Sequence, residues 1–513
     1  MSTLVKRAAL LANSSSIRPV WRAHWRAALA LFLAILPGCS AGPDFVRPEA
    51  PGGKYYNNSG DPRETVPVNG HSQQFESGAS AVANWWHLFN SPKLDAAVAD
   101  ALALNPGLQA AQASLRESQD NLRAGSGIFF PQAGALFSQS RQKSSPAAIG
   151  SSAPATIFNL TTLSASVSYA LDIFGGQRRA VEGLSAQVDQ QRALTLGTYM
   201  MLSGNIVNTC VAIAAYHDEI EAVEEMIALE KDQIAIAEKQ YQSGLTLYGA
   251  VLALRTQQAA LEASLPPLRQ RLSQAEHLLA TLEGKLPAEF QAPVISLAEL
   301  ELPRRLPLSM PSELVRQRPD ILAAEARLHA ASAEIGVATA ALFPSFTLNA
   351  SYGRNSRMMS TLTDSGSTLW GISGSALAPL FNGGTLSGRR RAAVDAYQQS
   401  LALYRQTLLA AFAEVADVVR ALEHDAEVTA IEVRAVQDAR LSMDLVKANY
   451  QAGMVNYLQV LTADIQYHQA RIGYLQAEAR QLQDSAALFA ALGGGWTDDP
   501  LAKAKAELGD ARQ

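Results

Sequence analysis

Two kinds of hydrophobic pattern run through the chain, and the first alternates between apolar and small polar side chains. From Leu163 to Ile173, apolar residues occupy every second position and most of the others are serine. A period of two places the apolar side chains on one face of a β-strand. The same period predicts further strands at 131–141, 345–352 and 370–378. Polar segments at 142–160 and 354–368 predict a long exposed loop within each strand pair.

Elsewhere apolar residues recur every three or four positions, which is typical of amphipathic helices. The two longest patterns cover 178–241 and 385–450. At the usual rise per residue each predicts a helix of about 95 Å, roughly three times the thickness of a bilayer's hydrocarbon core. Shorter helices are predicted at 92–105, 108–128, 250–282 and 458–492. Pro266 and Pro267 should kink or interrupt the helix that contains them.

A segment that separates two of these helices occurs twice, at 241–252 and 450–461. Both copies share a glycine and, at the same spacing, a tyrosine: Gly244 and Tyr248 in the first, Gly453 and Tyr457 in the second. A glycine adopts the left-handed backbone that ends many helices. Because a second helix starts within a few residues, each copy predicts the tip of a helical hairpin.

The order helix, two strands, long helix, tip and helix is found in both halves of the chain. The prolines that precede and follow the first helix of each half are equally spaced: Pro106 and Pro131, Pro319 and Pro344. We interpret 92–283 and 312–492 as a tandem duplication, joined by a proline-rich linker at 284–311.

The N-terminus has the pattern of a secretory signal. Basic residues precede an apolar run of about ten residues, which is too short to span a bilayer. The run ends in Leu36-Pro37-Gly38-Cys39, which resembles the bacterial lipobox, whose cysteine becomes the lipidated first residue of the mature protein. We expect a signal peptide at 1–38 and a lipid anchor and leader at 39–91, attached through Cys39. The alternative is an ordinary cleaved signal in which Cys39 has no special role.

Composition and charge narrow the function classes. The chain has 513 residues, of which 48% are hydrophobic and 17% charged, with a formal net charge of −5. This balance gives no reason to expect nucleic-acid binding, which usually requires a basic face. The two cysteines have no metal-ligand spacing, and Cys210 falls on an apolar helical stripe typical of a buried thiol. No stretch after the signal is apolar for long enough to predict a transmembrane helix.

The sequence carries no catalytic or cofactor-binding pattern. The segment from Gly371 to Ser375 lacks the final glycine of a nucleophile elbow. Walker-type phosphate loops are absent, and the histidines have no partners at metal-ligand spacing. We therefore expect no enzymatic activity, no cofactor and no metal.

The predicted strands are similar to part of a transmembrane β-barrel. A barrel needs about eight strands, and an open sheet edge is not tolerated in lipid, so other copies of the chain must complete the sheet. The long helices would continue from the strands as a helical tube outside the membrane. The predicted fold is therefore an α+β membrane protein that forms a homo-oligomer.

A series of short motifs, in this order and spacing, resembles the TolC-like outer membrane factors, in particular the lipoprotein branch of resistance-nodulation-division (RND) efflux systems. The motifs are Gly42-Pro43-Asp44-Phe45, Trp85-Trp86, Arg318-Pro319-Asp320-Ile321, Ala341-Leu342-Phe343-Pro344, Phe381-Asn382-Gly383-Gly384 and Ala491-Leu492-Gly493-Gly494-Gly495-Trp496. The resemblance implies a homotrimer with a twelve-stranded outer-membrane β-barrel and a periplasmic α-helical barrel. It also implies an equatorial belt, with 284–311 and the C-terminal tail 493–513 as candidates.

The same resemblance implies a function and its partners. The trimer would be the exit duct through which an inner-membrane RND pump and a periplasmic adaptor protein pass drugs and toxic small molecules to the exterior. Lipid of the outer membrane would surround the barrel, and Cys39 would carry palmitate-type acyl groups. The alternatives are an outer-membrane duct for type I secretion or metal export, or a structural coiled-coil lipoprotein without a pore. The strands argue against the last alternative.

The resemblance also implies a gate at the second hairpin tip. Carried over by motif, the residues that narrow the periplasmic end of the tunnel are Tyr457, Leu458 and Thr462, with Leu458 forming a hydrophobic ring. Relatives carry a carboxylate where this chain has Thr462, and Asp464 lies roughly 200° further round the helix. Because threonines cannot form a charged constriction, we expect packing to close this mouth. In the alternative, Tyr457 and Leu458 only pack the start of the helix.

Two charged clusters have competing interpretations. The acidic residues within 218–225 either make the tunnel negative, which would favour cationic cargo, or lie on a solvated outer face. Arg178-Arg179 and Arg389-Arg390-Arg391 each follow a strand pair. They contact lipid headgroups, bridge neighbouring protomers or are simply solvated.

Overall fold

The computed structural model describes residues 40–145, 150 and 154–494. These residues fall into two compact units. The strand unit comprises 40–46, 120–186 and 329–399, and the helical unit comprises 47–119, 187–328 and 400–494. Cys39 and residues 495–513 lie outside the described part of the chain.

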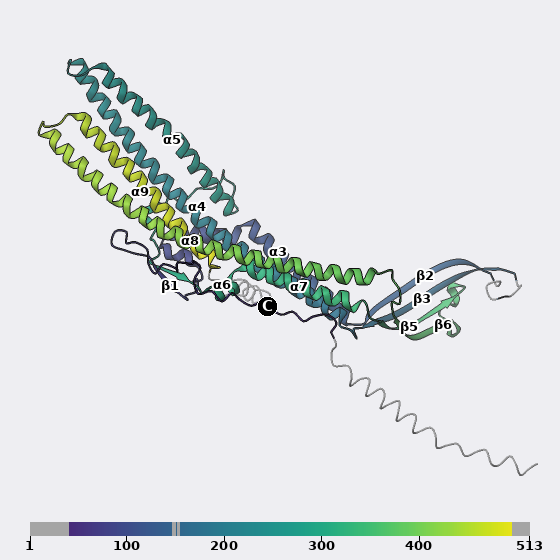
Figure 1. Cartoon of the computed structure of the whole chain (residues 1–513). Helices are drawn as coiled ribbons and strands as arrows, with labels where there is room; N and C mark the ends of the chain where they lie inside the picture. The colour runs from purple at the N-terminus through teal and green to yellow at the C-terminus, as the bar shows by residue number, and fades with distance from the viewer. Residues whose placement is uncertain (1–39, 146–149, 151–153, 495–513) are drawn as a thin grey trace, which may run out of the picture. The chain divides into compact units, whose positions relative to one another are not determined.

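The strand unit contains an antiparallel sheet in the order β2-β3-β5-β6 (Figure 1). Its strands are β2 (Gln132–Ser144), β3 (Thr156–Leu171), β5 (Ser345–Ser356) and β6 (Thr368–Leu377). All four strands are predicted by the period of two. The register aligns Val167, Ala350 and Ile372 in one row of a single face. Ile372 in this row is 80% exposed, so the apolar face has no cover from the described residues.

The two loops predicted within the strand pairs are shorter than the sequence suggests. The pairing of β2 with β3 continues outward to Ser144 and Thr156, so much of 142–160 is strand. Thr156, Ile157 and Phe158 are types that favour strands, and the ladder continues through them. The loop expected at 354–368 likewise loses its ends to β5 and β6.

The helices account for most of the described chain. They are α2 (Pro92–Leu104), α3 (Pro106–Ser126), α4 (Gly176–Gln242), α5 (Tyr248–Leu282), α6 (Pro311–Gln317), α7 (Pro319–Ala340), α8 (Thr385–Gln451) and α9 (Tyr457–Ala491). The long helices α4 and α8 have 67 residues each, and their hairpin partners α5 and α9 have 35 each. A tandem duplication would produce such equal lengths. By length and composition α4 alone among the described helices could cross a membrane, and 67% of that window is buried inside the protein.

Of the kink or interruption expected at Pro266 and Pro267, the interruption does not occur, because α5 continues from Tyr248 to Leu282. Each proline lacks the amide donor that a helix normally uses, which weakens the helix at this point. Leu265 compensates, because it is buried in a cluster with Val223 and Ile227 of α4. Tertiary packing therefore carries the helix across the two prolines.

The leader and the linker are not plain loops. Within the helical unit, β1 (Gln74–Ser77) of the leader pairs in parallel with β4 (Arg305–Leu308) of the linker. Both strands are too short to show a period in the sequence. The leader also supplies Trp85, whose ring stacks on Phe489 of α9 with centroids 5.2 Å apart. This part of the chain is folded onto the long helices and shares their core.

Candidate functional site at the hairpin tips

The two tips have the same backbone construction. Gly244 and Gly453 both have positive φ, 69° and 74°. After α4, the amide of Leu245 donates to the carbonyl of Gln240 and the amide of Gly244 to that of Tyr241. The same two hydrogen bonds end α8, from Met454 and from Gly453. This is the Schellman arrangement, in which a left-handed glycine satisfies the last carbonyls of a helix.

Paired tyrosines brace each tip. The rings of Tyr241 and Tyr248 lie 5.1 Å apart between centroids, and those of Tyr450 and Tyr457 lie 5.2 Å apart. At the second tip, the side chain of Asn456 also accepts a hydrogen bond from the amide of Gln459, which caps the start of α9. The residue at the equivalent position of the first tip makes no such bond. Burial, reinforced by the carboxylate of Asp464, raises the pKa of Tyr457.

The two helical hairpins run alongside each other (Figure 1). They share a small core directly behind the tips. It is formed by buried residues of three helices: Ile234 and Ala237 of α4, Val251 and Leu254 of α5, and Leu461 of α9. Val251 and Leu461 come from the two copies of the repeated segment. A movement of one tip therefore disturbs packing in the other.

The three residues expected to form the gate occupy different environments. Tyr457 is half-buried against Tyr450, whereas Leu458 is 60% exposed and makes no part of the core. Thr462 is exposed one turn further along α9, where its hydroxyl donates to the carbonyl of Leu458 at 3.0 Å. The Thr462 hydroxyl is thus bound to its own helix, and Leu458 is an exposed apolar side chain at the start of α9.

Asp464 does not stand in for the missing carboxylate at position 462. Its side chain is 7% exposed and lies 3.0 Å from the ammonium group of Lys447 on α8. The carboxylate therefore joins the two helices of the second hairpin. His468, one turn further on, is also buried, and this burial lowers its pKa.

The tips expose large apolar residues in addition to Leu458. Leu245, Leu247 and Met454 are 79%, 81% and 69% exposed, although they are large apolar residues in turns. Clusters of exposed apolar side chains mark interaction sites in many proteins, and Leu245 and Leu247 lie two residues apart in the first tip. The signal in the sequence was the use of leucine and methionine where turns usually carry small polar residues.

Most of the acidic cluster of α4 is paired within the chain. Asp218 accepts hydrogen bonds from the hydroxyl of Ser296 and the amide of Leu297 in the linker. Glu224 pairs with Arg269 and Glu225 with Arg471. Glu219 is buried and accepts from Gln476, and burial raises its pKa. Glu219 is buried, whereas Glu224 and Glu225 keep about half of their side chains exposed, so these pairs connect α4 to its neighbours partly at the protein surface.

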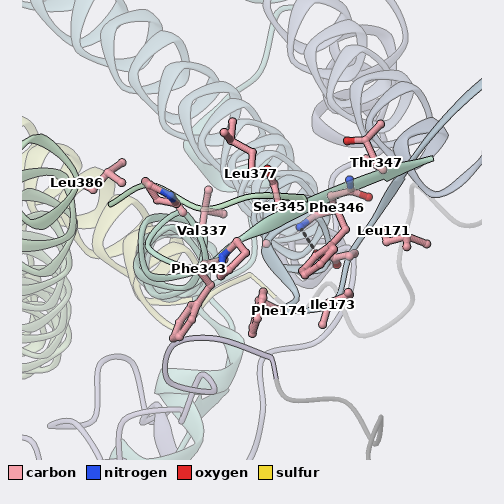
Figure 2. Close-up of a pocket in the computed structure, with 18 residues that line it drawn as sticks. Leu171, Ile173, Phe174, Val337, Phe343, Ser345, Phe346, Thr347, Leu377 and Leu386 are labelled. Carbon is pink, nitrogen blue, oxygen red and sulfur yellow. Dashed lines mark hydrogen bonds between the residues drawn. The ribbon is translucent and has the colours of Figure 1, made fainter. Parts of the chain in front are cut away.

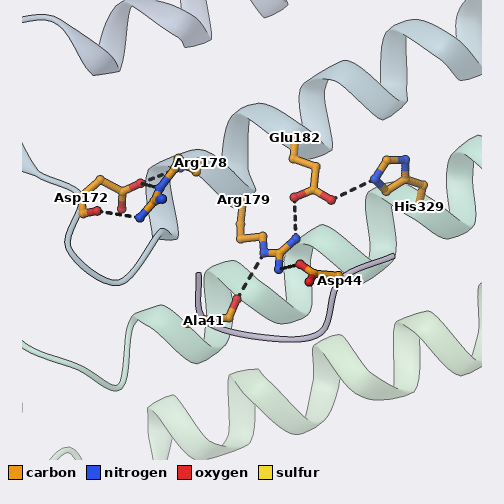
Figure 3. A network of polar contacts seen from close by, with 7 residues as sticks. All are labelled: Ala41, Asp44, Asp172, Arg178, Arg179, Glu182 and His329. Atoms are coloured by element: carbon orange, nitrogen blue, oxygen red, sulfur yellow. Dashed lines mark hydrogen bonds and ion pairs between the residues drawn. The ribbon is translucent and has the colours of Figure 1, made fainter. Parts of the chain in front are cut away.

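In the strand unit, Arg178 and Arg179 are likewise engaged within the chain (Figure 3). Arg178 binds Asp172, the last residue before the corner that leads into α4. Arg179 is 5% exposed and pairs with Asp44 at 2.5 Å and Glu182 at 2.7 Å. Arg179 is thus held within its own chain, whereas the Arg178 side chain remains 44% exposed. Arg389, Arg390 and Arg391 are exposed.

The structure leaves part of the expected site undescribed. Cys39, the expected lipid-attachment residue, lies outside the described residues. Cys210 is fully buried, as its apolar stripe predicts, and burial raises its thiol pKa to about 12. Within the described ranges no group of three or more His, Cys, Asp or Glu side chains could hold a metal ion.

Comparisons with known proteins agree on one family. A family model described as outer membrane efflux protein matches residues 97–285 and 310–494. The chain is 30% identical over 440 residues to the pyoverdine export outer membrane protein OpmQ of Pseudomonas putida, covering 85% of this chain and 93% of that protein. It is 28% identical over 471 residues to the cation efflux system protein CusC of Escherichia coli, covering 90% and 96%. The solved structure of the outer-membrane channel OprN superposes with a TM-score of 0.80 at 26% identity, covering 89% of this chain and 100% of that one.

Proposed function

The chain belongs to the outer membrane efflux protein family, and we propose that it is the exit duct of a tripartite efflux system. In this role it conducts small molecules passively from the periplasm through the outer membrane. It carries out no reaction and takes its energy from a partner pump. The similarity to a channel protein along nearly its whole length supports this role.

The observation that carries the proposal is the open four-stranded sheet of an outer membrane protein. β2 and β6 are its edge strands, and its apolar face includes Trp370 and Ile372, which are 72% and 80% exposed. In lipid, unpaired backbone groups at a sheet edge are too costly, and four strands are too few to close. Three copies that pair β6 of one with β2 of the next would give a twelve-stranded barrel in which every edge is satisfied.

The closed end of the duct is proposed to lie at the hairpin tips. Three copies of Leu458 would meet around the axis, supported by Tyr457 and by Thr462 one turn further along α9. The exposed position of Leu458 supports this assignment, because 60% of the residue's surface is left uncovered within its own chain. The engagement of Asp464 by Lys447 supports closure by packing rather than by a ring of charge.

The exposed apolar residues at both tips are proposed to dock a periplasmic adaptor protein. Leu245, Leu247 and Met454 give this end of the molecule a surface suited to a helical partner. An inner-membrane pump of the RND type would engage the duct through this adaptor.

Lipid attachment at Cys39, after removal of a signal peptide at 1–38, is proposed to anchor the chain. The sequence pattern supports the anchor, and so does the docked position of the residues that follow the cysteine. Cys39→Ser should remove the lipid, which the mass of the mature protein would reveal. An unchanged mature mass would refute the anchor.

Planar-bilayer recording on the purified oligomer tests the duct directly, and native mass spectrometry gives the number of copies. We expect trimers that conduct poorly in the resting state and strongly once the tips are loosened. Trimers that never conduct, even after the tips are disrupted, would overturn the proposal.

A second candidate function is cation export, which is favoured by the 28% identity to CusC. Deletion of the gene followed by growth on copper or silver salts and on organic antibiotics separates the two cargo classes. Sensitivity to metal salts alone would favour cation export.

A further inference from the structure

A cavity of about 530 Å³ lies in the strand unit where the sheet gives way to the helices. Its walls come from the end of β3, the end of α7, the start of β5 and the start of α8 (Figure 2). Most side chains that line it are apolar, among them Ile173, Phe174, Val337, Phe343 and Phe346. The volume is within the range of roughly 300–1,000 Å³ that is typical of ligand sites.

The one charged group that lines this cavity already has its hydrogen-bond partners, so the cavity offers no free charge to a charged ligand. Asp172 is the only carboxylate among the lining residues. Its oxygens accept from the amides of Gln177 and Arg178 and from the Arg178 side chain. The carboxylate thus caps the start of α4. The cavity suits a hydrocarbon.

The described chain begins beside the wall of this cavity. The amide of Ala41 donates to the carbonyl of Phe174 at 2.9 Å. The Cα of Ser40 lies 2.9 Å from the point where a Cβ on Gly175 would stand, so only glycine allows this approach. Phe174 lines the cavity, and Gly175 is the next residue. One peptide unit, about 3.8 Å between Cα atoms, separates Ser40 from the residue before it.

The leader is fastened in this position by contacts made after Ser40 (Figure 3). The side chain of Arg179 donates to the carbonyl of Ala41 and pairs with Asp44. Phe45 stacks on His329 with ring centroids 4.4 Å apart. These contacts hold residues 41–45 in place, so that Ser40 lies beside the cavity and the rest of the leader continues away from it.

We propose that the cavity holds a fatty acyl chain carried by Cys39. The inference rests on lipid attachment at Cys39, which is part of the proposed function. An acyl chain in the cavity would fix the anchor to the protein as well as to the bilayer, and it would fill the space between sheet and helices. Attachment of the lipid would thereby stabilise the packing between the sheet and the helices of the strand unit.

Photo-crosslinking of the full-length protein tests the proposal. Cells are supplied with a fatty acid that carries a diazirine near its tail and a terminal alkyne, and the protein is purified from the outer membrane. Mass spectrometry of the N-terminal peptide first shows whether Cys39 carries the probe. After irradiation, we expect cross-links in peptides that contain Phe174, Val337 or Phe343.

A matched pair of variants sharpens the test. Val337→Phe places a larger side chain at the cavity wall, so these cross-links should be lost while lipidation is unchanged. Ile372→Phe enlarges a residue on the exposed apolar face of β6 and should leave them intact. If Val337→Phe fails to fold, the positions of the cross-links in the wild-type protein still decide whether the acyl chain occupies the cavity.

The possible failures are distinguishable. A Cys39 without lipid overturns the anchor and this inference together. A lipidated Cys39 whose probe reaches only bilayer lipid or the strand surfaces overturns the cavity site and leaves the duct untouched. Labelling of the cavity in lipidated wild-type protein by a photoreactive phospholipid would show that membrane lipid occupies it instead.

Discussion

The carboxylate of Asp464 on α9 lies 3.0 Å from the ammonium group of Lys447 on α8, and the aspartate side chain is almost buried. This ion pair ties together the two helices of the second hairpin behind its tip. Removal of one partner from such a pair is more harmful than replacement of both, because it leaves a buried charge without compensation.

Lys447→Ala should therefore loosen the second tip. We expect a cost of about 1–3 kcal/mol for the unsatisfied carboxylate, visible as faster hydrogen exchange at the ends of α8 and α9 and as higher conductance. The double variant Lys447→Met with Asp464→Leu should lie closer to the wild type. Wild-type exchange rates in Lys447→Ala would show that the pair does not hold the tip.

The tip glycines allow a test of backbone strain. Gly453 has a φ of 74° with open space around it, so Gly453→Ala probes conformation alone. A left-handed alanine costs about 1–2 kcal/mol, and the second tip should exchange faster. Gly249→Ala is the control, because Gly249 is a helical residue of α5 whose added Cβ would also meet nothing. That change should be neutral or stabilising by up to about 1 kcal/mol, and equal effects at the two positions would contradict the assignment of strain.

The strands and long helices could be predicted from the sequence because each pattern persists over many residues. The alternation from Leu163 to Ile173 and the helical spacing along α4 and α8 leave little ambiguity of period. The tips followed from two glycines that sit in the same local context. These features are local, and local preference and tertiary structure agree in them.

The features that the sequence did not predict depend on contacts between distant segments. β1 and β4 have four residues each, and they pair although the whole first repeat, 92–283, separates them in the chain. In the sequence Asp218 is one of several neighbouring acidic residues, and only the folded structure shows that it accepts a hydrogen bond from Ser296 of the linker. The burial of Arg179 could not be predicted, because the leader segment that covers it has no regular pattern of apolar residues. No periodicity encodes such pairings.

The close approach of the leader to α7 makes a second glycine prediction. A Cβ on Gly42 would lie 2.5 Å from the Cα of Gly336, and Gly42 has a φ of 86°. Gly42→Ala should lift the leader, which hydrogen exchange would detect as lost protection of the Ala41 amide. Gly52→Ala is the matched control, since an added Cβ there meets nothing within 4 Å. Retained protection in Gly42→Ala would mean that the leader is not held by this contact.

Burial of His468 predicts a dependence on pH behind the tips. The pKa of His468 in the folded protein is lower than the value of about 6.5 for an exposed histidine. As the pH falls through about 6.5, the histidine therefore takes up a proton more readily in the unfolded chain than in the folded one, which favours unfolding. The stability contributed by neutral His468 is complete above this pH and is lost progressively below it. Glu225 and Asp464 oppose the shift, whereas Arg471 and Lys447 add to it.

The expected result is a lower protection factor for the amides of α9 at pH 5.5 than at pH 7.5, once each rate is corrected for the slower intrinsic exchange at acid pH. The difference should be smaller in His468→Gln. Glu230, whose pKa burial raises, acts in the opposite sense and is present in both proteins. The comparison between the two proteins therefore isolates the histidine. An unchanged pH dependence in His468→Gln would exclude His468 as its source.

The gate assignment makes the most direct prediction about transport. Leu458 is 60% exposed at the second tip, so Leu458→Ala removes little packing within one chain. In the trimer it would remove the apolar ring, and we expect a several-fold rise in single-channel conductance and greater antibiotic leakage into cells that lack the pump. Leu245→Ala truncates a leucine that is 79% exposed at the first tip, outside the proposed ring. It should leave conductance unchanged and weaken adaptor binding. Equal conductance in the wild type and Leu458→Ala, with trimers intact, would place the constriction elsewhere.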